Sequence, residues 1–544
     1  MTLQKHIYTY GRQRIEFLFP AIVFLAAALA WAPILMAGFV NDDFQLLLYH
    51  QPQSFGQIFA PFYDTGVTDI FWRPVPNFLH SATMHLFGFD AFWFRLTNIL
   101  LLAATSAAFY IFLIKINISK NAALFAGLLF AAAPSREIVA GWIAARGDIL
   151  ALLFMLVAAI YYIRWRQRMR QPEVIFAIIA YLLAVFSKEI AFAAVGIPII
   201  LEFLFDKKER AWKTAFSAAG IATLAIIFFL IMRWIVTGSM LAPPPNYQDF
   251  DTITSIRNFF IYMPLAFLSA ETLEHMTSAA YWTSAPALGI FMTLAALAAI
   301  RPIRLMDKQE RLLAAAGFLW FAIFALPAAP MLMRWYAFVP SAGIFLVFAA
   351  IMNSSIRRNG RRFWIAAAIL VVGFAVTSFR HSMEWPDASR SVSRSLNSLK
   401  LMNLKSDTLR IWGAPDKIDR VNAFKIGLEQ AVEYAVGRDV EALSPLRMEL
   451  SEDSQIRLKL SENFAEYLIT NGRFVQSGMP STSLIHAEEF EISREDWDAE
   501  ISNYIEINED STTSRAIIRF ARPVDSTDIF YLKDRFVRGD RYLK

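Results

Sequence analysis

The sequence predicts an α-helical polytopic membrane protein with about 11 transmembrane helices and a mixed α/β domain at its C-terminal end. Three observations lead to this fold class. Only 18% of the 544 residues are charged and 56% are hydrophobic, whereas soluble domains carry about 25% charged residues. Apolar runs of about 15 to 24 residues recur as far as residue 379, and such lengths suit bilayer-crossing helices. Lys and Arg gather beside every second apolar run, as they do in cytoplasmic loops.

The composition also excludes several classes of function. The chain contains no cysteine, which rules out disulfides, thiol catalysis and zinc sites with cysteine ligands. The net charge of +5 does not indicate a nucleic-acid partner, because the cations stand beside apolar segments and set membrane topology. The first apolar run, 17–40, is too long for a cleaved secretory signal, so we expect an uncleaved anchor.

The alternation of cationic and cation-poor junctions gives the order of the spans. We expect helices at 17–40, 96–114, 122–133, 149–163 and 174–186, then a returning helix before Lys207, and further helices at 215–237, 285–300, 312–326, 338–352 and 363–378. The apolar run 259–268 is too short to span comfortably, so we interpret it as re-entrant or interfacial. The N-terminus is then cytoplasmic, and the first loop, 41–90, lies outside.

From about residue 380 the pattern changes to dense charge and short apolar alternation. The segments 408–412 and 516–520 are typical of strands, and 428–436 is typical of a helix. We therefore predict two domains: a transmembrane domain, 1–379, and an extracytoplasmic soluble domain, 380–544.

The first candidate site is the acidic pair Asp42 and Asp43, directly after the first apolar run. One interpretation is a general base that accepts a proton from an acceptor hydroxyl. The other is a helix N-terminus, with Asn41 as the cap and acids favoured by the helix dipole. Adjacent side chains point in different directions, so we expect one working carboxylate and one structural partner.

Further charges are expected on the outer face. In the loop 134–148, Arg136 and Arg146 could hold phosphate oxygens, or they could pair with Glu137 and Asp148. Lys188 and Glu189 could bind an anion or neutralise each other. Arg233, inside an apolar run, could extend to the lipid headgroups or face a lipid phosphate. Arg73, Arg334 and Tyr336 add further cations and aromatic rings on the same face. The scattered residues His80, His85 and His275 are interpreted as packing residues rather than as a metal site.

Taken in order, these motifs resemble the C-type (GT-C) membrane glycosyltransferases, and most closely the protein O-mannosyltransferase-like branch. The resemblance covers about residues 15–380. It rests on Asn41-Asp42-Asp43-Phe44, Trp72-Arg73-Pro74, Arg136-Glu137 with Gly141-Trp142 and Arg146-Gly147-Asp148, Lys188-Glu189, and Arg334-Trp335-Tyr336 with Pro340-Ser341.

The resemblance implies an enzyme that takes a sugar from a polyprenyl-phosphate donor and inverts its anomeric carbon. Asp42 or Asp43 would be the base. Donor binding would fall to Arg73, Arg136, Glu137, Arg146, Asp148, Lys188, Glu189, Arg334 and Tyr336. We expect no metal cofactor, with a divalent cation at the acidic pair as the alternative. The acceptor would be a protein, lipid or glycan, and the location a bacterial inner membrane with the C-terminal domain in the periplasm.

Two other classes of protein compete with this interpretation. A secondary transporter or lipid flippase would place ionisable residues near the bilayer midplane and would carry inverted repeats. Here the charges follow the outer ends of the apolar runs, and the halves show no symmetry. A membrane scaffold with an outer binding domain would leave the acidic pair without a role.

Overall fold

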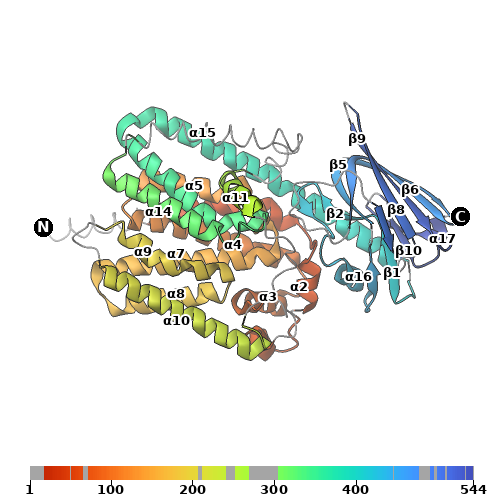
Figure 1. Cartoon of the computed structure of the whole chain (residues 1–544), viewed down its shortest axis with the longest axis horizontal. Coiled ribbons are helices and arrows are strands. Elements are labelled where there is room, and N and C mark those ends of the chain that lie inside the picture. The colour runs from red at the N-terminus through yellow and green to blue at the C-terminus, as the bar shows by residue number, and fades with distance from the viewer. Residues whose placement is uncertain are drawn as a thin grey trace. The chain divides into compact units, whose positions relative to one another are not determined.

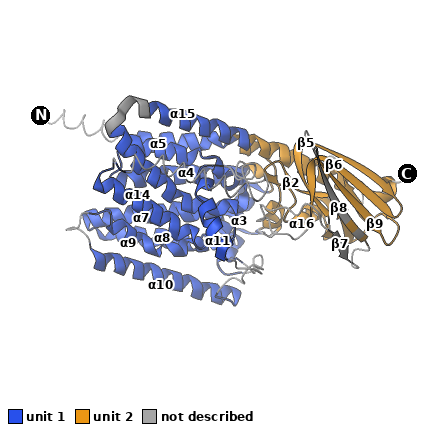
Figure 2. Cartoon of the chain, turned by 45° about the horizontal axis from the view of Figure 1, so that its top comes forward, with its two compact units in different colours: residues 1–32, 52–88, 93–382 blue, residues 33–51, 89–92, 383–544 orange. Residues whose placement is uncertain are grey.

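The computed structural model describes residues 17–49, 51–64, 71–205, 211–240, 252–268, 304, 306–402, 404–444, 446–476, 491–494, 499–508, 511–532 and 534–542. The chain divides into two compact units, which are coloured separately in Figure 2. Unit 1 comprises Met1–Ala32, Pro52–Gly88 and Trp93–Ser382, and unit 2 comprises Pro33–Gln51, Phe89–Phe92 and Met383–Lys544. The segment with the acidic pair thus belongs to the same unit as the C-terminal residues.

Unit 1 is built from helices (Figure 1). After a first helix, Phe17–Ala30, come η2 (Phe55–Phe62), α3 (Pro74–Phe87), α4 (Ala91–Lys115), α5 (Lys120–Ala131), η3 (Pro134–Arg136), α6 (Glu137–Gly141), η4 (Ile143–Ala145), α7 (Arg146–Arg168), α8 (Gln171–Val185), η5 (Glu189–Gly196), α9 (Ile197–Glu202), α10 (Trp212–Thr237), α11 (Thr252–Ile261), η6 (Pro264–Ala266), α14 (Lys308–Ala325), η7 (Arg334–Ala337) and the first part of α15 (Phe338–Lys400).

Five helices of the described residues are long and apolar enough to cross a membrane, or six if one bent pair is a single span. They are Ala91–Lys115, Ile143–Arg168, Trp212–Thr237, Arg334–Arg357 and Trp364–Lys400, and the bent pair is Lys120–Ala131 with Pro134–Gly141. The chain is therefore an integral membrane protein of the helical class. The expected total of 11 spans is not confirmed, and the expected helix at 285–300 lies outside the described residues.

The first apolar run is not the continuous helix that the sequence predicts. The α-helix ends at Ala30, Trp31 forms a turn, and a 3-10 helix, η1 (Ala32–Met36), follows. Pro33 explains the break, because proline lacks an amide hydrogen and disfavours helical geometry in the preceding residue. The indole Nε1 of Trp31 donates to the carbonyl of Ala131 in α5 at 3.0 Å, which fixes the end of the helix.

Two other expectations need correction. The returning helix before Lys207 is a 3-10 segment, η5, followed by the short α9, whose first turn contains Pro198. The outer loop expected at 134–148 is a series of short buried helical turns. The helices expected at 338–352 and 363–378 both lie within α15, and they correspond to two separate membrane-crossing segments, Arg334–Arg357 and Trp364–Lys400. In contrast, 259–268 is short and helical, as expected for a segment that does not span.

Small residues bring α14 and α15 into backbone contact. A Cβ atom on Gly317 would lie 2.6 Å from the carbonyl oxygen of Gly343, so neither helix tolerates a side chain at this crossing. Next to the crossing, Trp320 Nε1 donates to the carbonyl of Val339 at 3.1 Å. This contact fixes the start of α15, and with it the preceding turn η7.

Unit 2 contains two sheets in its described part. The first has the order β11-β10-β1-β4, with β1 (Thr408–Trp412) parallel to both β10 (Asp528–Tyr531) and β4 (Glu441–Leu443), and β11 (Phe536–Arg538) at the edge. The second has the order β3-β2-β5-β6-β9-β8-β7. Its strands are β3 (Val421–Asn422), β2 (Ala414–Ile418), β5 (Leu446–Ser461), β6 (Phe464–Gln476), β9 (Ser511–Phe520), β8 (Ala499–Asn508) and β7 (Glu491–Arg494).

The described residues of unit 2 also form the end of α15, most of η1, and the short helices α2 (Asp43–Tyr49), α16 (Leu428–Val436) and α17 (Gly539–Tyr542). The predicted strands at 408–412 and 516–520 and the predicted helix at 428–436 are confirmed. β10 is buried on both faces, as expected of a strand in parallel pairing.

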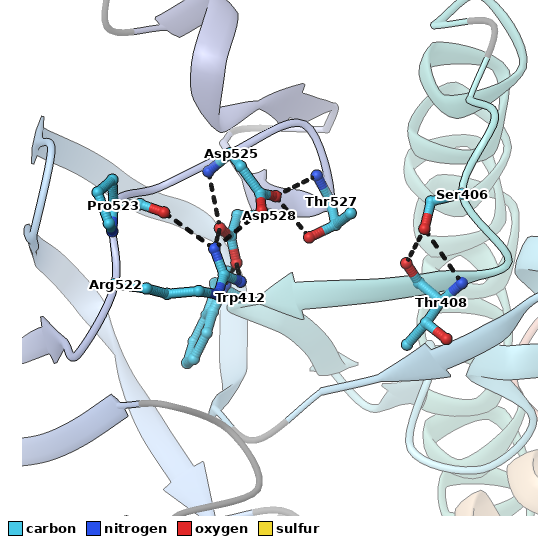
Figure 3. A network of polar contacts seen from close by, with 8 residues as sticks. All are labelled: Ser406, Thr408, Trp412, Arg522, Pro523, Asp525, Thr527 and Asp528. Atoms are coloured by element: carbon cyan, nitrogen blue, oxygen red, sulfur yellow. Dashed lines mark hydrogen bonds and ion pairs between the residues drawn. The ribbon is translucent and has the colours of Figure 1, made fainter.

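A buried ion pair fastens the segment before β10 to β1 (Figure 3). Arg522 donates to both carboxylate oxygens of Asp528, at 2.9 and 3.1 Å, and Trp412 Nε1 donates to Oδ1 at 3.2 Å. The amide of Asp525 donates to Oδ2 at 3.0 Å. The Asp528 carboxylate is therefore buried without loss of hydrogen bonds, which is the condition for a buried charge to be tolerated.

We expect the substitution Arg522→Ala to destabilise unit 2, because it leaves the Asp528 carboxylate buried without its cation. Breaking such a pair from one side costs about 3 kcal/mol. The measurement is hydrogen exchange of the full chain, which should accelerate at the amides of β1 and β10. The control is Arg515→Ala, whose side chain is half exposed in its pair with Glu466 and should cost less than about 1 kcal/mol. Equal exchange in the two variants would contradict the role of Arg522.

Candidate active site

Five residues that the sequence singled out come together in unit 1: Arg73, Asp148, Lys188, Glu189 and Tyr336. Arg73 donates through Nε and Nη2 to Glu189 Oε2, at 2.9 and 2.8 Å. Lys188 Nζ donates to Asp148 Oδ2 at 2.6 Å and lies 5.1 Å from the centre of the Tyr336 ring. We call this group the charged cluster.

The helices around the cluster explain why these side chains meet. Trp72, next to Arg73, packs against Phe186 and Phe229, with ring centres 5.5 and 5.3 Å apart. The amide of Val75 donates to the carbonyl of Phe186 at 3.3 Å, so the start of α3 is tied to the end of α8.

Asp148 approaches the same point from the first turn of α7. A Cβ on Gly147 would lie 3.1 Å from the carbonyl oxygen of Ser187, so glycine permits the close approach of α7 to the Ser187–Lys188 backbone. The ion pair between Asp148 and Lys188 follows from that approach.

Arg233 is a sixth member of the charged cluster. This buried residue of α10 interacts electrostatically with Glu189 and Arg73. The sequence left its role open between lipid headgroups and a phosphate, and its position within an apolar helix was the signal for function. Arg233 therefore adds a third cation beside Arg73 and Lys188, and cations gathered at one place favour an anionic ligand.

The pKa values show how strongly the members of the cluster depend on each other. Burial by itself would lower the pKa of Arg73, but the charge and hydrogen bond of Glu189 raise this pKa above its ordinary value. Burial would raise the pKa of Glu189, but the charge of Arg73 and its hydrogen bond lower it. Burial lowers the pKa of Lys188, Asp148 counteracts this effect, and the neighbouring charge of Arg73 adds to it. An additional anion would therefore stabilise the charged form of Lys188.

The two ion pairs differ in accessibility. The side chains of Lys188 and Asp148 are only 8% and 3% exposed, whereas those of Arg73 and Glu189 are 23% and 30% exposed. A ligand can therefore reach the cluster through the Arg73–Glu189 pair. The Lys188–Asp148 pair forms its buried side.

Asp42 and Asp43 lie in unit 2 and have different surroundings. Asp43 is fully buried, and its Oδ2 accepts from the amide of Val40 at 3.1 Å. Asp42 is partly exposed, and its Oδ1 accepts from Asn41 Nδ2 at 2.9 Å. Asn41 is not the helix cap that the sequence suggested, because α2 begins at Asp43 and directly follows Asp42. Asp43 is thus the buried member of the pair and Asp42 the partly exposed one.

Arg136 is completely buried, and neutral oxygens accept its hydrogen bonds. It donates to the carbonyl of Phe130 at 3.2 Å, to Ser135 Oγ at 3.2 Å and to Ser341 Oγ at 2.7 Å. Its guanidinium also lies 4.4 Å from the centre of the Phe130 ring. These contacts link η3 to α15, so Arg136 connects two parts of the bundle.

Arg146 makes similar contacts at the start of α7. It is completely buried and donates to Asn98 Oδ1 at 2.8 Å and to the carbonyl of Phe94 at 3.1 Å, both in α4. The suggested pairing of Arg146 with Asp148 is not what the structure shows, since Asp148 binds Lys188. Asn98 was missed at the sequence level, because a single amide in an apolar helix gives no signal for its partner.

The remaining candidates stay predictions. Glu137 is buried in α6, and Arg334 is partly buried in η7, two residues before Tyr336. Within the described ranges, no group of three or more His, Asp or Glu side chains could hold a metal ion. That finding does not test the expected metal independence.

Comparison with known proteins supports the resemblance. Residues 73–234 match the family model of dolichyl-phosphate-mannose-protein mannosyltransferases. The match confirms, over this segment, the resemblance to C-type membrane glycosyltransferases of the O-mannosyltransferase-like branch. No curated protein matches the chain.

Solved structures give weaker likenesses. ArnT from Cupriavidus metallidurans bound to undecaprenyl phosphate is 12% identical, with 78% of this chain and 85% of that chain covered and a TM-score of 0.44. The archaeal oligosaccharyltransferase AglB from Archaeoglobus fulgidus, in complex with an inhibitory peptide and a dolichol-phosphate, is 12% identical, with 79% and 65% covered and a TM-score of 0.41. At these TM-scores the likenesses support no functional conclusion.

We expect the substitution Arg136→Met to lower the thermal stability of the purified protein in detergent. Methionine keeps an apolar stem but removes the donors to Phe130 and Ser341, and each buried group left without a partner costs about 1 to 3 kcal/mol. The control is Arg168→Met, whose side chain is 49% exposed and 3.7 Å from Glu173. A melting temperature equal to that of the control would show that Arg136 is not a structural link.

Proposed function

We propose that this protein is an inverting glycosyltransferase that moves a sugar from a polyprenyl-phosphate donor to an extracytoplasmic acceptor hydroxyl. One observation carries the proposal. The segment that matches the mannosyltransferase family, 73–234, contains the cations and carboxylates of the charged cluster: Arg73, Asp148, Lys188, Glu189 and Arg233. The cluster thus falls within the part of the chain for which the family resemblance is strongest.

The charged cluster suits the phosphate of the donor. Arg73 offers a planar guanidinium that can bind two phosphate oxygens, and Lys188 offers a compact positive charge. Glu189 and Asp148 hold these cations in place in the absence of substrate. A bound phosphate adds negative charge beside these carboxylates, and the neighbouring cations Arg73, Lys188 and Arg233 offset part of the repulsion.

The same cations would favour the chemical step. The acceptor oxygen attacks the anomeric carbon, the bond from that carbon to the phosphate oxygen breaks, and the bonding electron pair leaves with the polyprenyl phosphate. Negative charge on the phosphate grows during this step, and fixed cations stabilise it. A single displacement inverts the anomeric carbon.

The acceptor hydroxyl must lose its proton, and we assign this proton to Asp42. Of the acidic pair, Asp42 is the partly exposed member, whereas Asp43 binds the Val40 amide and is buried. The side chain of Asn41 orients the Asp42 carboxylate. General-base catalysis of this kind contributes about 10²- to 10⁴-fold to the rate.

Several parts of the proposal follow from the sequence. The N-terminus is cytoplasmic and the C-terminal residues are periplasmic, in a bacterial inner membrane. The sugar is a hexose of the mannose type, the acceptor is a protein, lipid or glycan, and the reaction needs no metal ion. Arg136, Arg146, Glu137 and Arg334 support donor binding, the first two by holding the helices in position.

We expect Asp42→Asn to abolish sugar transfer at unchanged expression, because the amide cannot accept the proton of the acceptor hydroxyl. Asp43→Asn should retain part of the activity and lower stability, since the amide can still accept from Val40. The assay follows release of polyprenyl phosphate from a panel of polyprenyl-phosphate sugars with purified protein. Full activity in both single variants would refute the acidic pair as the base.

We expect Arg73→Gln to raise the apparent KM for the donor by about 10- to 100-fold, the equivalent of one charge-assisted hydrogen bond. The double variant Asp148→Asn with Lys188→Met removes both charges of the buried pair and should act in the same direction. Arg164→Gln is the control, because this cation lies at the far end of α7, 3.8 Å from Glu173. Donor KM values equal to that of the control would argue against the cluster as the phosphate site.

A further inference from the structure

The acidic segment after the first helix is held by a loop more than 300 residues away in the sequence. Within unit 2, the amide of Asn41 donates to the carbonyl of Ala423 at 2.6 Å, and the amide of Ile426 donates to Asn41 Oδ1 at 2.8 Å. Both the backbone and the side chain of Asn41 are therefore bound to the loop 423–427. We call this loop the clamp loop.

Asn41 transmits this contact to Asp42. After Oδ1 has accepted from Ile426, the amide group Nδ2 still donates to Asp42 Oδ1 at 2.9 Å. Asn41 has a φ of +54°, a left-handed conformation that asparagine tolerates better than most residues. The clamp loop thus fixes the orientation of Asn41, and Asn41 fixes one oxygen of the Asp42 carboxylate.

The clamp loop is itself firmly held. The amide of Ala423 donates to the carbonyl of Asp416 at 2.8 Å, and the amide of Phe424 donates to the carbonyl of Pro415 at 3.0 Å. Arg447 of β5 donates to the carbonyl of Phe424 at 2.9 Å. The loop is therefore an extension of the β2–β5 sheet, and a rigid support is what a positioned carboxylate requires.

Contacts between two helices also attach the acidic segment to the C-terminal residues of unit 2. α2 packs against α16, with the rings of Phe44 and Tyr434 5.6 Å apart, and the two helices lie together in Figure 1. Phe44 and Leu47 of α2 are both buried. The acidic segment is thus fixed at its start by Asn41 and beyond it by α2.

Gly427 sets the closest approach between the clamp loop and the acidic segment. Its φ is +75°, and a Cβ atom there would lie 3.0 Å from the carbonyl oxygen of Asn41 and 3.2 Å from the Cα of Asp42. Gly437, at the other end of α16, has nearly the same φ of +77° but nothing within 4 Å of a Cβ atom. The two glycines share a backbone constraint and differ in what their Cβ would touch.

We propose that the clamp loop is a positioning element of the enzyme, which holds Asp42 in the orientation needed to accept the proton of the acceptor. This inference rests on the proposed function of Asp42 and adds to it a role for the C-terminal residues of the chain. Ala423, Ile426 and Gly427 act through Asn41 and are positioning residues. They do not contact the reacting atoms in this proposal. The C-terminal residues thus control the rate of the chemical step.

The test compares Gly427→Ala with Gly437→Ala in the full-length protein. Both variants place a methyl group at a positive φ, so both carry similar backbone strain. Only Gly427→Ala pushes on Asn41 and Asp42. Because a displacement of about 1 Å can cost 100-fold in rate, we expect kcat to fall by about 10- to 100-fold in Gly427→Ala, at unchanged donor KM. Gly437→Ala should stay within about two-fold of the parent chain in kcat.

A second variant keeps the proposal testable if Gly427→Ala does not yield folded protein. Asn41→Gly tolerates the positive φ but loses both side-chain hydrogen bonds, to Ile426 and to Asp42. We expect the same loss of kcat at unchanged donor KM, because Asp42 loses the hydrogen bond that orients its carboxylate. A purely structural role of Asn41 would lower the yield of folded protein and leave the kcat of the folded protein unchanged.

The outcomes separate this inference from the proposed function. Loss of activity in Asp42→Asn together with equal kcat values in Gly427→Ala and Gly437→Ala would overturn the positioning role and leave the base in place. Full activity in Asp42→Asn would overturn both. Loss of kcat in Gly427→Ala or Asn41→Gly, at unchanged donor KM and with Gly437→Ala near the parent chain, would support the clamp loop.

Discussion

The cost of placing charge inside an apolar helical bundle is the constraint on which unit 1 depends. An isolated buried ion costs several kcal/mol, and only a close partner with good geometry offsets that cost. The pairs Lys188–Asp148 and Arg73–Glu189 meet this condition, and they join α7 and α3 to the turn between α8 and η5. Removing either cation would leave its partner carboxylate without a counter-charge, at a similar cost in free energy. The ion pairs therefore favour one position of the turn. The charged cluster is thus a structural joint as well as a candidate binding site.

The buried arginines of unit 1 divide into two kinds, and the division separates binding from support. Arg136 and Arg146 direct their hydrogen bonds to carbonyl, hydroxyl and amide oxygens of neighbouring helices. A ligand could recruit them only by breaking those bonds. Arg73 instead pairs with a carboxylate that is partly exposed, so an incoming anion can share the cation without opening the bundle. Sequence patterns place all three residues on one face, but only the identity of their partners distinguishes their roles.

Hydropathy was sufficient to locate the helices that are apolar throughout, because their burial needs no specific partner. The spans at 96–114, 149–163 and 215–237 fall within observed helices, and the span at 174–186 extends one residue beyond α8. The prediction failed where local chemistry overrides hydropathy, as at Pro33, which ends the first helix, and in the partly 3-10 segment before Pro198. The site was predictable as a set of unexplained charges. Its pairing was not, since Lys188 binds a carboxylate 40 residues away while the adjacent Glu189 binds Arg73.

The acidic segment illustrates why a motif can be recognised while its support cannot. Asp42 and Asp43 stand out because they follow an uncharged run, but nothing in that run indicates that Asn41 binds a loop at 423–427. The only local signs are an asparagine before the acids and a glycine before α16, both common in turns. The positive φ values of Asn41 and Gly427 can be interpreted only once their contact is known, because a Cβ atom on Gly427 would press against Asn41 and Asp42. The candidate phosphate cations belong to unit 1 and the candidate base to unit 2. In the proposed reaction, donor binding would depend on the charged cluster of unit 1, and proton acceptance would depend on the sheet of unit 2 that carries the clamp loop.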